Sequence, residues 1–404
     1  MSKENLFNGE GCGFMQANFD EIINRKGTNS VKWDMLTEKF GSEDVLPMWV
    51  ADMDFATPKT ILSALKKSLD VQILGYSIPS DGLYDAIIDW QSNHHQLNLN
   101  KSDILFSPGV VPSLALMVTA LTEPGDSVMI HDPVYPPFTE VVRSNQRQLV
   151  RSSLIIENKQ FKMDFVDIEE KLKNHSVKLF ILCNPHNPGG RVWSTTELKQ
   201  LAQLCKKYKV ILVSDEIHGD LVFAPHSFTS VVTLDPSYQE FVVTLTAATK
   251  TFNMAGVKHS MIFVKNKELK AKIAMEQHKS EQDGINTFGY VATEAAYNTG
   301  EVWLEELLDY LSENLDYACK FLEKELPQVK FLKPEATYLI WFDCSYLGLS
   351  DSALRKQLVN VGRLGLNPGI SFGPNGSQFM RMNIATSRAT LKEGLERLKV
   401  ALTK

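Results

Sequence analysis

Short apolar runs alternate with amphipathic stretches through the middle of the chain. The runs at 126–132, 147–155, 177–183, 209–215, 240–246 and 259–264 are short and rich in β-branched residues, as strands are. Helical patterns at 112–121, after residue 138 and at 195–208 separate several of them. Strands separated by helices of this length predict an α/β fold with a mainly parallel sheet covered on both faces.

The pattern changes near residue 298. A long charged helix is predicted over 300–326, followed by shorter strands at 337–343 and 378–384 and a final helix. We therefore predict a large domain over 61–297 and a smaller α+β domain over 298–404. Residues 1–60 are expected to contribute to the smaller domain. A chain of 404 residues is long enough for two such units.

Composition narrows the classes of function. The net charge of −6 gives no general attraction to nucleic acid or to an anionic membrane. The five cysteines are scattered without a CxxC pair, which argues against a disulfide framework or a zinc site. The first residues lack the apolar core of a signal peptide, and no run reaches transmembrane length, so a cytoplasmic location is expected.

Chemically useful side chains follow three of the predicted strands. Asn187 comes after the run at 177–183, Asp215 ends the run at 209–215, with His218 close behind, and Lys250 follows the run at 240–246. Each alone has an ordinary interpretation as a turn residue, helix cap, core histidine or surface lysine. Because parallel strands end at the same edge of a sheet, the sequence predicts that an amide, a carboxylate and an amine share one crevice.

A further strand leads into a candidate phosphate-binding site. The stretch "ILFSPGVVPSLALM" predicts a strand, a glycine turn at Gly109 and then a helix, whose free N–H groups would attract an anion. It lacks GxxxxGK and GxGxxG, so neither a nucleotide P-loop nor a dinucleotide fingerprint is indicated. Together with a lysine and a carboxylate, this suggests a phosphorylated aldehyde cofactor held as a Schiff base.

Several ordered segments carry a family resemblance. They include "LPMWVADMDFATP", "GYSIPSDGLYDAIIDW", "FSPGVVPSL", "DPVYPPF", "ILCNPHNPGGRVW", "SDEIHGDL", "ATKTFNMAGV" and "FGPNGSQFMRMNIATSR". The chain resembles pyridoxal-phosphate enzymes of the aspartate aminotransferase fold (PLP fold type I) over nearly its whole length. Within that group it is most similar to the cystathionine β-lyases and C–S lyases related to the maltose-regulon modulator.

The resemblance implies the residues that hold the cofactor ring. Lys250 would form the Schiff base and then move protons, and Asp215 would pair with the pyridine nitrogen. Tyr135 would stack on the ring and share in catalysis. Asn187 would bond the ring's 3-oxygen and help to bind substrate, with His218 near the same edge.

The resemblance also implies the phosphate and carboxylate contacts. Val110, Val111 and Thr249 would meet the phosphate, and Tyr76 would reach it from the neighbouring subunit of a homodimer. Arg381 would grip the substrate carboxylate, with Arg388 as the alternative.

Two positions depart from the wider aminotransferase pattern. Lys258 stands where an arginine usually grips phosphate, and Ala247 replaces a common hydroxyl residue. A lysine supplies charge without a fork, so phosphate binding is expected to rely more on backbone amides and Thr249.

The branch implies β-elimination at the C–S bond of L-cystathionine and related amino acids, giving pyruvate, ammonia and a thiol. Two alternatives remain: an aminotransferase with the same fold and cofactor, and an additional regulatory role through binding a transcription factor.

Two local patterns are rejected as sites. "GISFG" lacks a following helix and a later histidine for a hydrolase triad, and His94–His95 is expected on a helix surface without metal ligands nearby.

Overall fold

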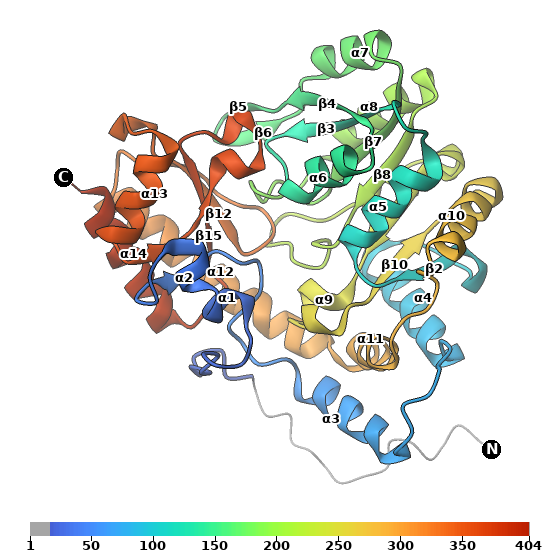
Figure 1. Cartoon of the computed structure of the whole chain (residues 1–404), viewed down its shortest axis with the longest axis horizontal. Helices are drawn as coiled ribbons and strands as arrows, with labels where there is room; N and C mark the ends of the chain where they lie inside the picture. Colours follow the sequence, from blue (N-terminus) through green and yellow to red (C-terminus); the bar gives the residue numbers. More distant parts are fainter. Residues whose placement is uncertain (1–16, 404) are drawn as a thin grey trace.

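The computed structural model describes residues 17–403 and contains a central seven-stranded sheet (Figure 1). The strand order is β2-β10-β9-β8-β7-β3-β4, and β10 alone runs antiparallel to its neighbours β2 and β9. The predicted α/β fold with a mainly parallel sheet is confirmed. The strands are β2 (Ile104–Ser107), β3 (Ser127–Asp132), β4 (Gln148–Ser153), β7 (Val177–Cys183), β8 (Ile211–Asp215), β9 (Val242–Thr246) and β10 (Ser260–Phe263).

Helices cover both faces of this sheet, because its strands are apolar on both sides. In β7, Leu179 and Ile181 join the core beneath α5 (Val110–Leu121), α6 (Pro136–Ser144) and α10 (Lys267–Lys279). Phe180 and Leu182 join the core on the other face, with α7 (Phe165–Asn174) and α8 (Thr195–Tyr208). This alternation is what the two-residue repeat of a strand requires.

Four more helices complete the large domain: α3 (Lys59–Ser68), α4 (Asp81–His95), α9 (Ala248–Thr251) and α11 (Thr287–Thr299). Helix α11 lies against both α3 and α4. A hairpin of β5 (Ile155–Glu157) and β6 (Gln160–Lys162) follows β4. The single strand predicted over 147–155 is therefore two strands, because the chain leaves the sheet after Ser153.

The C-terminal part forms a second, antiparallel sheet in the order β11-β12-β15-β14 (Figure 1, orange and red). Its strands are β11 (Lys330–Leu332), β12 (Leu339–Asp343), β14 (Asn367–Pro368) and β15 (Phe379–Asn383). Its helices are α12 (Glu301–Glu325), α13 (Asp351–Asn360) and α14 (Arg388–Leu402). The predicted change of character after residue 298 thus coincides with a different kind of sheet.

The N-terminal segment runs alongside this smaller sheet. It contains α1 (Val31–Asp34), α2 (Leu36–Phe40) and β1 (Leu46–Pro47), and β1 pairs in parallel with β13 (Leu364–Gly365). The domain limits at residues 60 and 297 stay a prediction.

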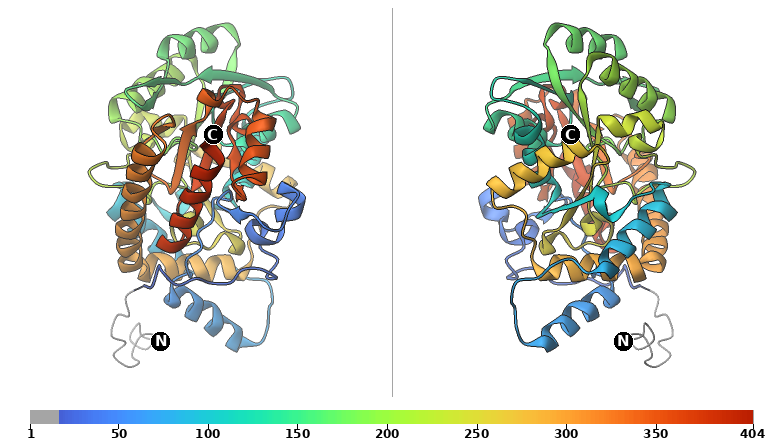
Figure 2. Two further views of the ribbon diagram at one scale, coloured as in Figure 1. Left: turned by 90° about the vertical axis from the view of Figure 1, so that its left-hand side faces the viewer. Right: turned by 90° about the vertical axis from the view of Figure 1, so that its right-hand side faces the viewer.

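Residues 69–80, which we call the arm, join α3 to α4 along the outside of the molecule (Figure 2). Its apolar side chains are exposed: Leu69, Val71, Ile73, Leu74, Tyr76 and Ile78. Tyr76 is fully exposed, at 109%. Nowhere in residues 17–403 is a helix both long enough and apolar enough to span a membrane.

The expectation that His95 lies on a helix surface is wrong. Its side chain is only 9% exposed, and its Nε2 lies 2.7 Å from Oδ1 of Asp220. The acidic partner is 125 residues away in the sequence, so no local pattern indicated it.

Candidate active site

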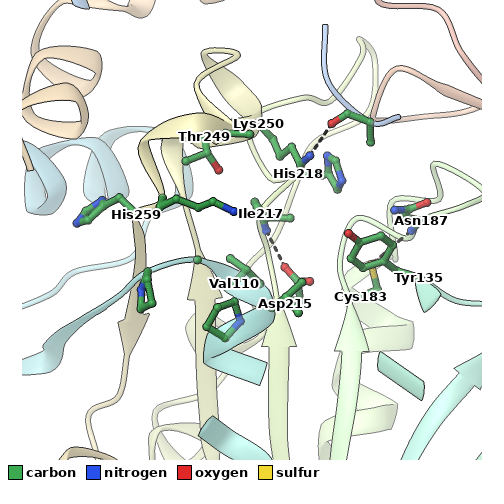
Figure 3. Close-up of a pocket in the computed structure, with 17 residues that line it drawn as sticks. Val110, Tyr135, Cys183, Asn187, Asp215, Ile217, His218, Thr249, Lys250 and His259 are labelled. Carbon is green, nitrogen blue, oxygen red and sulfur yellow. Dashed lines mark hydrogen bonds between the residues drawn. The ribbon is translucent and has the colours of Figure 1, made fainter. Parts of the chain in front are cut away.

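One cavity of about 480 Å³ lies at the carboxyl ends of β7, β8 and β9. Its volume is that of a small-molecule site. Eight of the predicted site residues line it: Val110, Val111, Tyr135, Asn187, Asp215, His218, Thr249 and Lys250. Figure 3 shows Lys250 and Asp215 between Thr249 on one side and Tyr135 and Asn187 on the other. The strands β7, β8 and β9 are neighbours, and this adjacency brings the side chains together.

The start of α5 forms one end of the cavity. Gly109 precedes the helix with φ of 151°, which is unfavourable for other residues, and Val110 and Val111 are the first helical residues. Their N–H groups have no partner within the helix and carry its positive dipole end. Thr249 and Lys258 line the same cavity. This end therefore suits a phosphate group.

Lys250 is a partly buried lysine whose Nζ donates to the carbonyl oxygen of Ala51. Burial lowers its pKa to about 8, although the negative charges of Asp52 and Asp215 oppose the shift. An amine with this pKa is deprotonated in part near neutral pH, so it can act as a nucleophile or a base.

Asp215 is buried at the end of β8, and its Oδ1 accepts a hydrogen bond from the backbone N–H of Ile217. Burial raises its pKa to about 7, against the opposing effects of the Ile217 bond and of Lys250. A buried carboxylate without a bound cation is unfavourable, so this position favours a ligand with a protonated nitrogen.

Arg381 enters the site from β15 of the smaller sheet. Its guanidinium donates to Oδ1 of Asn187 at 2.9 Å, to Oδ1 of Asn367 at 2.7 Å and to the carbonyl of Trp49 at 3.1 Å. Its Nε is buried without a partner, and none of its contacts among residues 17–403 is a carboxylate. Burial lowers the pKa of Arg381 to about 10. This cation is therefore available to an incoming carboxylate.

His218 and Tyr135 add neutral groups to the cavity. Burial and the nearby cations Lys250 and Arg381 lower the pKa of His218 to about 3, so its imidazole is neutral. Burial raises the pKa of the Tyr135 hydroxyl, which stays protonated near neutral pH.

Tyr76 and Arg388 lie elsewhere. Tyr76 stands on the arm and does not line the cavity of its own chain. Arg388, at the start of α14, donates from Nε to Oδ1 of Asn314 and lies 3.6 Å from Glu313, also outside the cavity. Arg381 does not line the cavity itself, but it donates to Asn187, which does, whereas the partner of Arg388, Asn314, does not. The geometry therefore favours Arg381 over Arg388 as the carboxylate ligand.

Two contributions to the site have no signal in the sequence. The carbonyl of Ala51 binds both Lys250 and the hydroxyl of Tyr338, and Cys183 lies beside Asp215 in the sheet, where its Sγ accepts from the N–H of Asn187. A backbone acceptor carries no residue signature, and a cysteine at a strand end looks like a core residue. No cluster of three metal-binding side chains occurs within 17–403.

The chain belongs to the aminotransferase class I and II family, whose pattern matches residues 43–398. It is 46% identical to cystathionine beta-lyase PatB of Bacillus subtilis, over 96% of this chain and 100% of that protein. The PLP-bound C–S lyase from Staphylococcus hominis has 34% identity and a TM-score of 0.91, covering 98% of this chain and 100% of its own. Cystalysin from Treponema denticola, whose structure contains pyridoxal 5'-phosphate, has 32% identity and a TM-score of 0.93, covering 96% and 99%.

Proposed function

We propose that the protein is a pyridoxal 5'-phosphate-dependent carbon–sulfur lyase that acts on L-cystathionine and related sulfur-containing amino acids. The observation that carries this proposal is the convergence of Lys250, Asp215 and the start of α5 in one cavity. The activities named for the relatives of similar length support the choice of reaction.

The residues of the cavity fit the cofactor at each of its chemical groups. The N–H groups of Val110 and Val111 and the hydroxyl of Thr249 suit the phosphate, and Lys250 suits the aldehyde. Within residues 17–403, the hydrogen bond that the buried carboxylate of Asp215 accepts comes from the neutral backbone N–H of Ile217, and a protonated ring nitrogen would supply the missing cation.

When bound, the cofactor supplies an electron-withdrawing ring that stabilises the electron pair left on the substrate's α-carbon. Asp215 keeps a proton on the ring nitrogen, which maintains this withdrawal. Arg381 and Asn187, which bond each other, would hold the substrate carboxylate, and Tyr135, which lines the cavity, would cover the ring. Lys250, once free, takes the α-proton.

Elimination then breaks the bond between the β-carbon and sulfur, and the sulfur leaves with the electron pair as a thiolate. For cystathionine, this thiolate takes up a proton and is released as homocysteine. Addition of water to the remaining three-carbon fragment gives pyruvate and ammonia. A transaminase would instead return the proton to the cofactor and require a keto acid.

The decisive experiment supplies L-cystathionine without a keto acid and follows pyruvate and free thiol. Sustained release of equimolar pyruvate and thiol supports the lyase. Absence of release, with rapid turnover when an amino acid and a keto acid are added together, would make the protein an aminotransferase. Borohydride reduction followed by peptide mapping should place the cofactor on Lys250, and a label on another lysine would contradict the assignment.

We also propose a homodimer in which Tyr76 reaches the phosphate in the partner's cavity. The support is the arm, whose contiguous apolar side chains are exposed in the single chain. A patch of this kind is typical of a surface that another protein covers.

A further inference from the structure

Lys250 lies on α9, a helix of only four residues. One turn is too short to be stable by its own hydrogen bonds. Its first residue is preceded by Ala247, which offers no side-chain cap. The position of Lys250 must therefore be set by contacts between α9 and the rest of the protein.

One such contact is made by Thr251, the residue after Lys250. Thr251 is completely buried, and its hydroxyl donates to Oδ2 of Asp220 at 2.7 Å. Asp220 lies in the turn 217–220, which follows Asp215 at the end of β8 and includes His218. This short segment therefore contacts the cavity through His218 and α9 through Asp220.

Two side chains of α4 hold the other oxygen of Asp220. Trp90 Nε1 donates to Oδ1 at 3.1 Å, and His95 Nε2 lies 2.7 Å from the same atom. Burial alone would lower the pKa of His95, but the hydrogen bond and charge of Asp220, with Glu216 nearby, raise it instead. The raised pKa of His95 favours its charged form beside the Asp220 carboxylate. The contacts from Trp90 and His95 together fix the direction of the Asp220 side chain.

Packing and a second anchor complete this arrangement. The ring of Trp90 meets Phe252 edge-on, with centroids 5.7 Å apart. On the other side of the turn, Asn253 Nδ2 donates to the carbonyls of Met53 and Phe55, at 3.1 and 2.7 Å. The turn that carries Lys250 is therefore held from two directions.

We propose that Asp220 is a positioning residue that, through Thr251, fixes Lys250 for proton transfer at the substrate's α-carbon. The inference rests on the proposed role of Lys250 as the base. The side chain of Lys250 must change partners during the reaction. The hydrogen bond from Thr251 to Asp220 holds the backbone of α9 in place during that change. A small displacement of a reacting group is costly, since about 1 Å can reduce a rate about 10²-fold.

The test uses the holoenzyme and L-alanine in D2O, with exchange of the α-proton followed by NMR. L-Alanine has no β-leaving group, and α-proton removal precedes both elimination and transamination. We expect Thr251→Val to slow exchange at saturating L-alanine about ten-fold, with a change in alanine affinity below about two-fold, because the substrate contacts are intact. Thr251→Ser, which keeps the hydroxyl, should exchange within about two-fold of wild type.

Ser152→Ala is the matched control. Ser152 is also completely buried, and its hydroxyl also donates to a carboxylate, Asp167, at 2.7 Å, but it lies on β4 away from the cavity. This variant should lose thermal stability without a change in exchange. If Thr251→Val does not fold, Thr251→Ala gives the same comparison without extra methyl groups.

His95→Gln separates positioning from folding. It removes the imidazole beside Asp220 but supplies an amide N–H that can still donate to Oδ1, and the bonds from Trp90 and Thr251 remain. Asp220 should therefore keep its direction, so the melting temperature should fall while exchange stays within about three-fold of wild type. Exchange in Thr251→Val equal to wild type, or an equal loss in Thr251→Ser, would overturn the proposal. Wild-type exchange without pyruvate release from cystathionine would instead overturn the lyase assignment alone.

Discussion

Arg381 is a buried cation whose hydrogen-bond partners are neutral. Its contacts to Asn187, Asn367 and Trp49 are to amide and carbonyl oxygens, and its Nε has no partner among residues 17–403. Neutral acceptors orient the guanidinium without neutralising it. At the scale of single residues, the Arg381 guanidinium is therefore oriented to bind a negatively charged group such as a substrate carboxylate.

Replacing Arg381 with Gln should raise KM for amino-acid substrates about 10- to 100-fold, since a hydrogen bond to a charged group contributes about 1.5–3 kcal/mol. Steady-state kinetics of pyruvate release measures this change. Arg388→Gln is the comparison, because Arg388 contacts Asn314 and lies outside the cavity. A larger rise in KM for Arg388→Gln than for Arg381→Gln would move the role to Arg388.

Asp215 should make the stability of the cofactor-free protein depend on pH. Burial raises its folded pKa from 3.8 to about 7. The folded state therefore binds this proton more tightly than the unfolded state, and the contribution is full below about pH 4 and lost as pH rises through 7. The free energy of unfolding, relative to Asp215→Asn, should fall across that range.

Denaturant titrations of both proteins at several pH values measure this difference. Glu216 titrates in the same range, but it is present in both proteins and cancels in the comparison. Curves that remain parallel from pH 4 to 8 would show that Asp215 does not carry the raised pKa.

At the scale of elements, the start of α5 would supply most of the proposed phosphate site, and Lys258 would add a charge. Lys258 lines the cavity in a left-handed conformation, with φ of 53°, but it is exposed. Exposed charge pairs contribute about 0.2–1 kcal/mol. The charge of Lys258 should thus matter less than the fixed N–H groups of the helix.

We expect Lys258→Gln to weaken binding of pyridoxal 5'-phosphate by no more than about five-fold, and to leave binding of pyridoxal, which has no phosphate, unchanged. Equilibrium titration of the cofactor-free protein by absorbance gives both constants. Lys209→Gln is the control, because Lys209 is an exposed lysine with a similar φ of 56° at the end of α8. Equal weakening for both ligands would mean that Lys258 does not contact the phosphate.

Elements with local signals could be predicted from the sequence, whereas features set by distant partners could not. Helix α8 has the predicted bounds, 195–208, because Ser194 and Glu197 form a capping box before an amphipathic pattern. The run that becomes β10 predicts a strand but carries no mark of its antiparallel direction. Likewise, the partnership of Asp220 with His95 and Thr251 joins three separate segments, and only the folded chain reveals it.

At the scale of the whole molecule, the arm is the feature that suggests a second copy, because its apolar side chains are exposed in a single chain. Leu74 is 71% and Tyr76 is 109% exposed, although both belong to an apolar stretch. If a second copy covers the arm, a charge placed there should prevent assembly, since burying an unpaired charge is unfavourable.

Leu74→Glu should therefore shift the protein to monomers in analytical ultracentrifugation and weaken its retention of the cofactor. Val166→Glu is the control, because Val166 is also exposed, at 78%, but lies on α7. Tyr76→Phe should keep the dimer and weaken cofactor retention only. A wild-type protein that is monomeric and fully active at high dilution would contradict the shared site.

The arm also has a consequence for the newly made chain. Its residues 71–78, "VQILGYSI", contain neither a charged residue nor a proline, a composition that favours intermolecular β-pairing when exposed. Until a partner covers it, each folded copy presents this segment to every other chain being synthesised nearby. Slow synthesis or dilution would prolong that interval, so the yield of intact protein should depend on how quickly two copies meet.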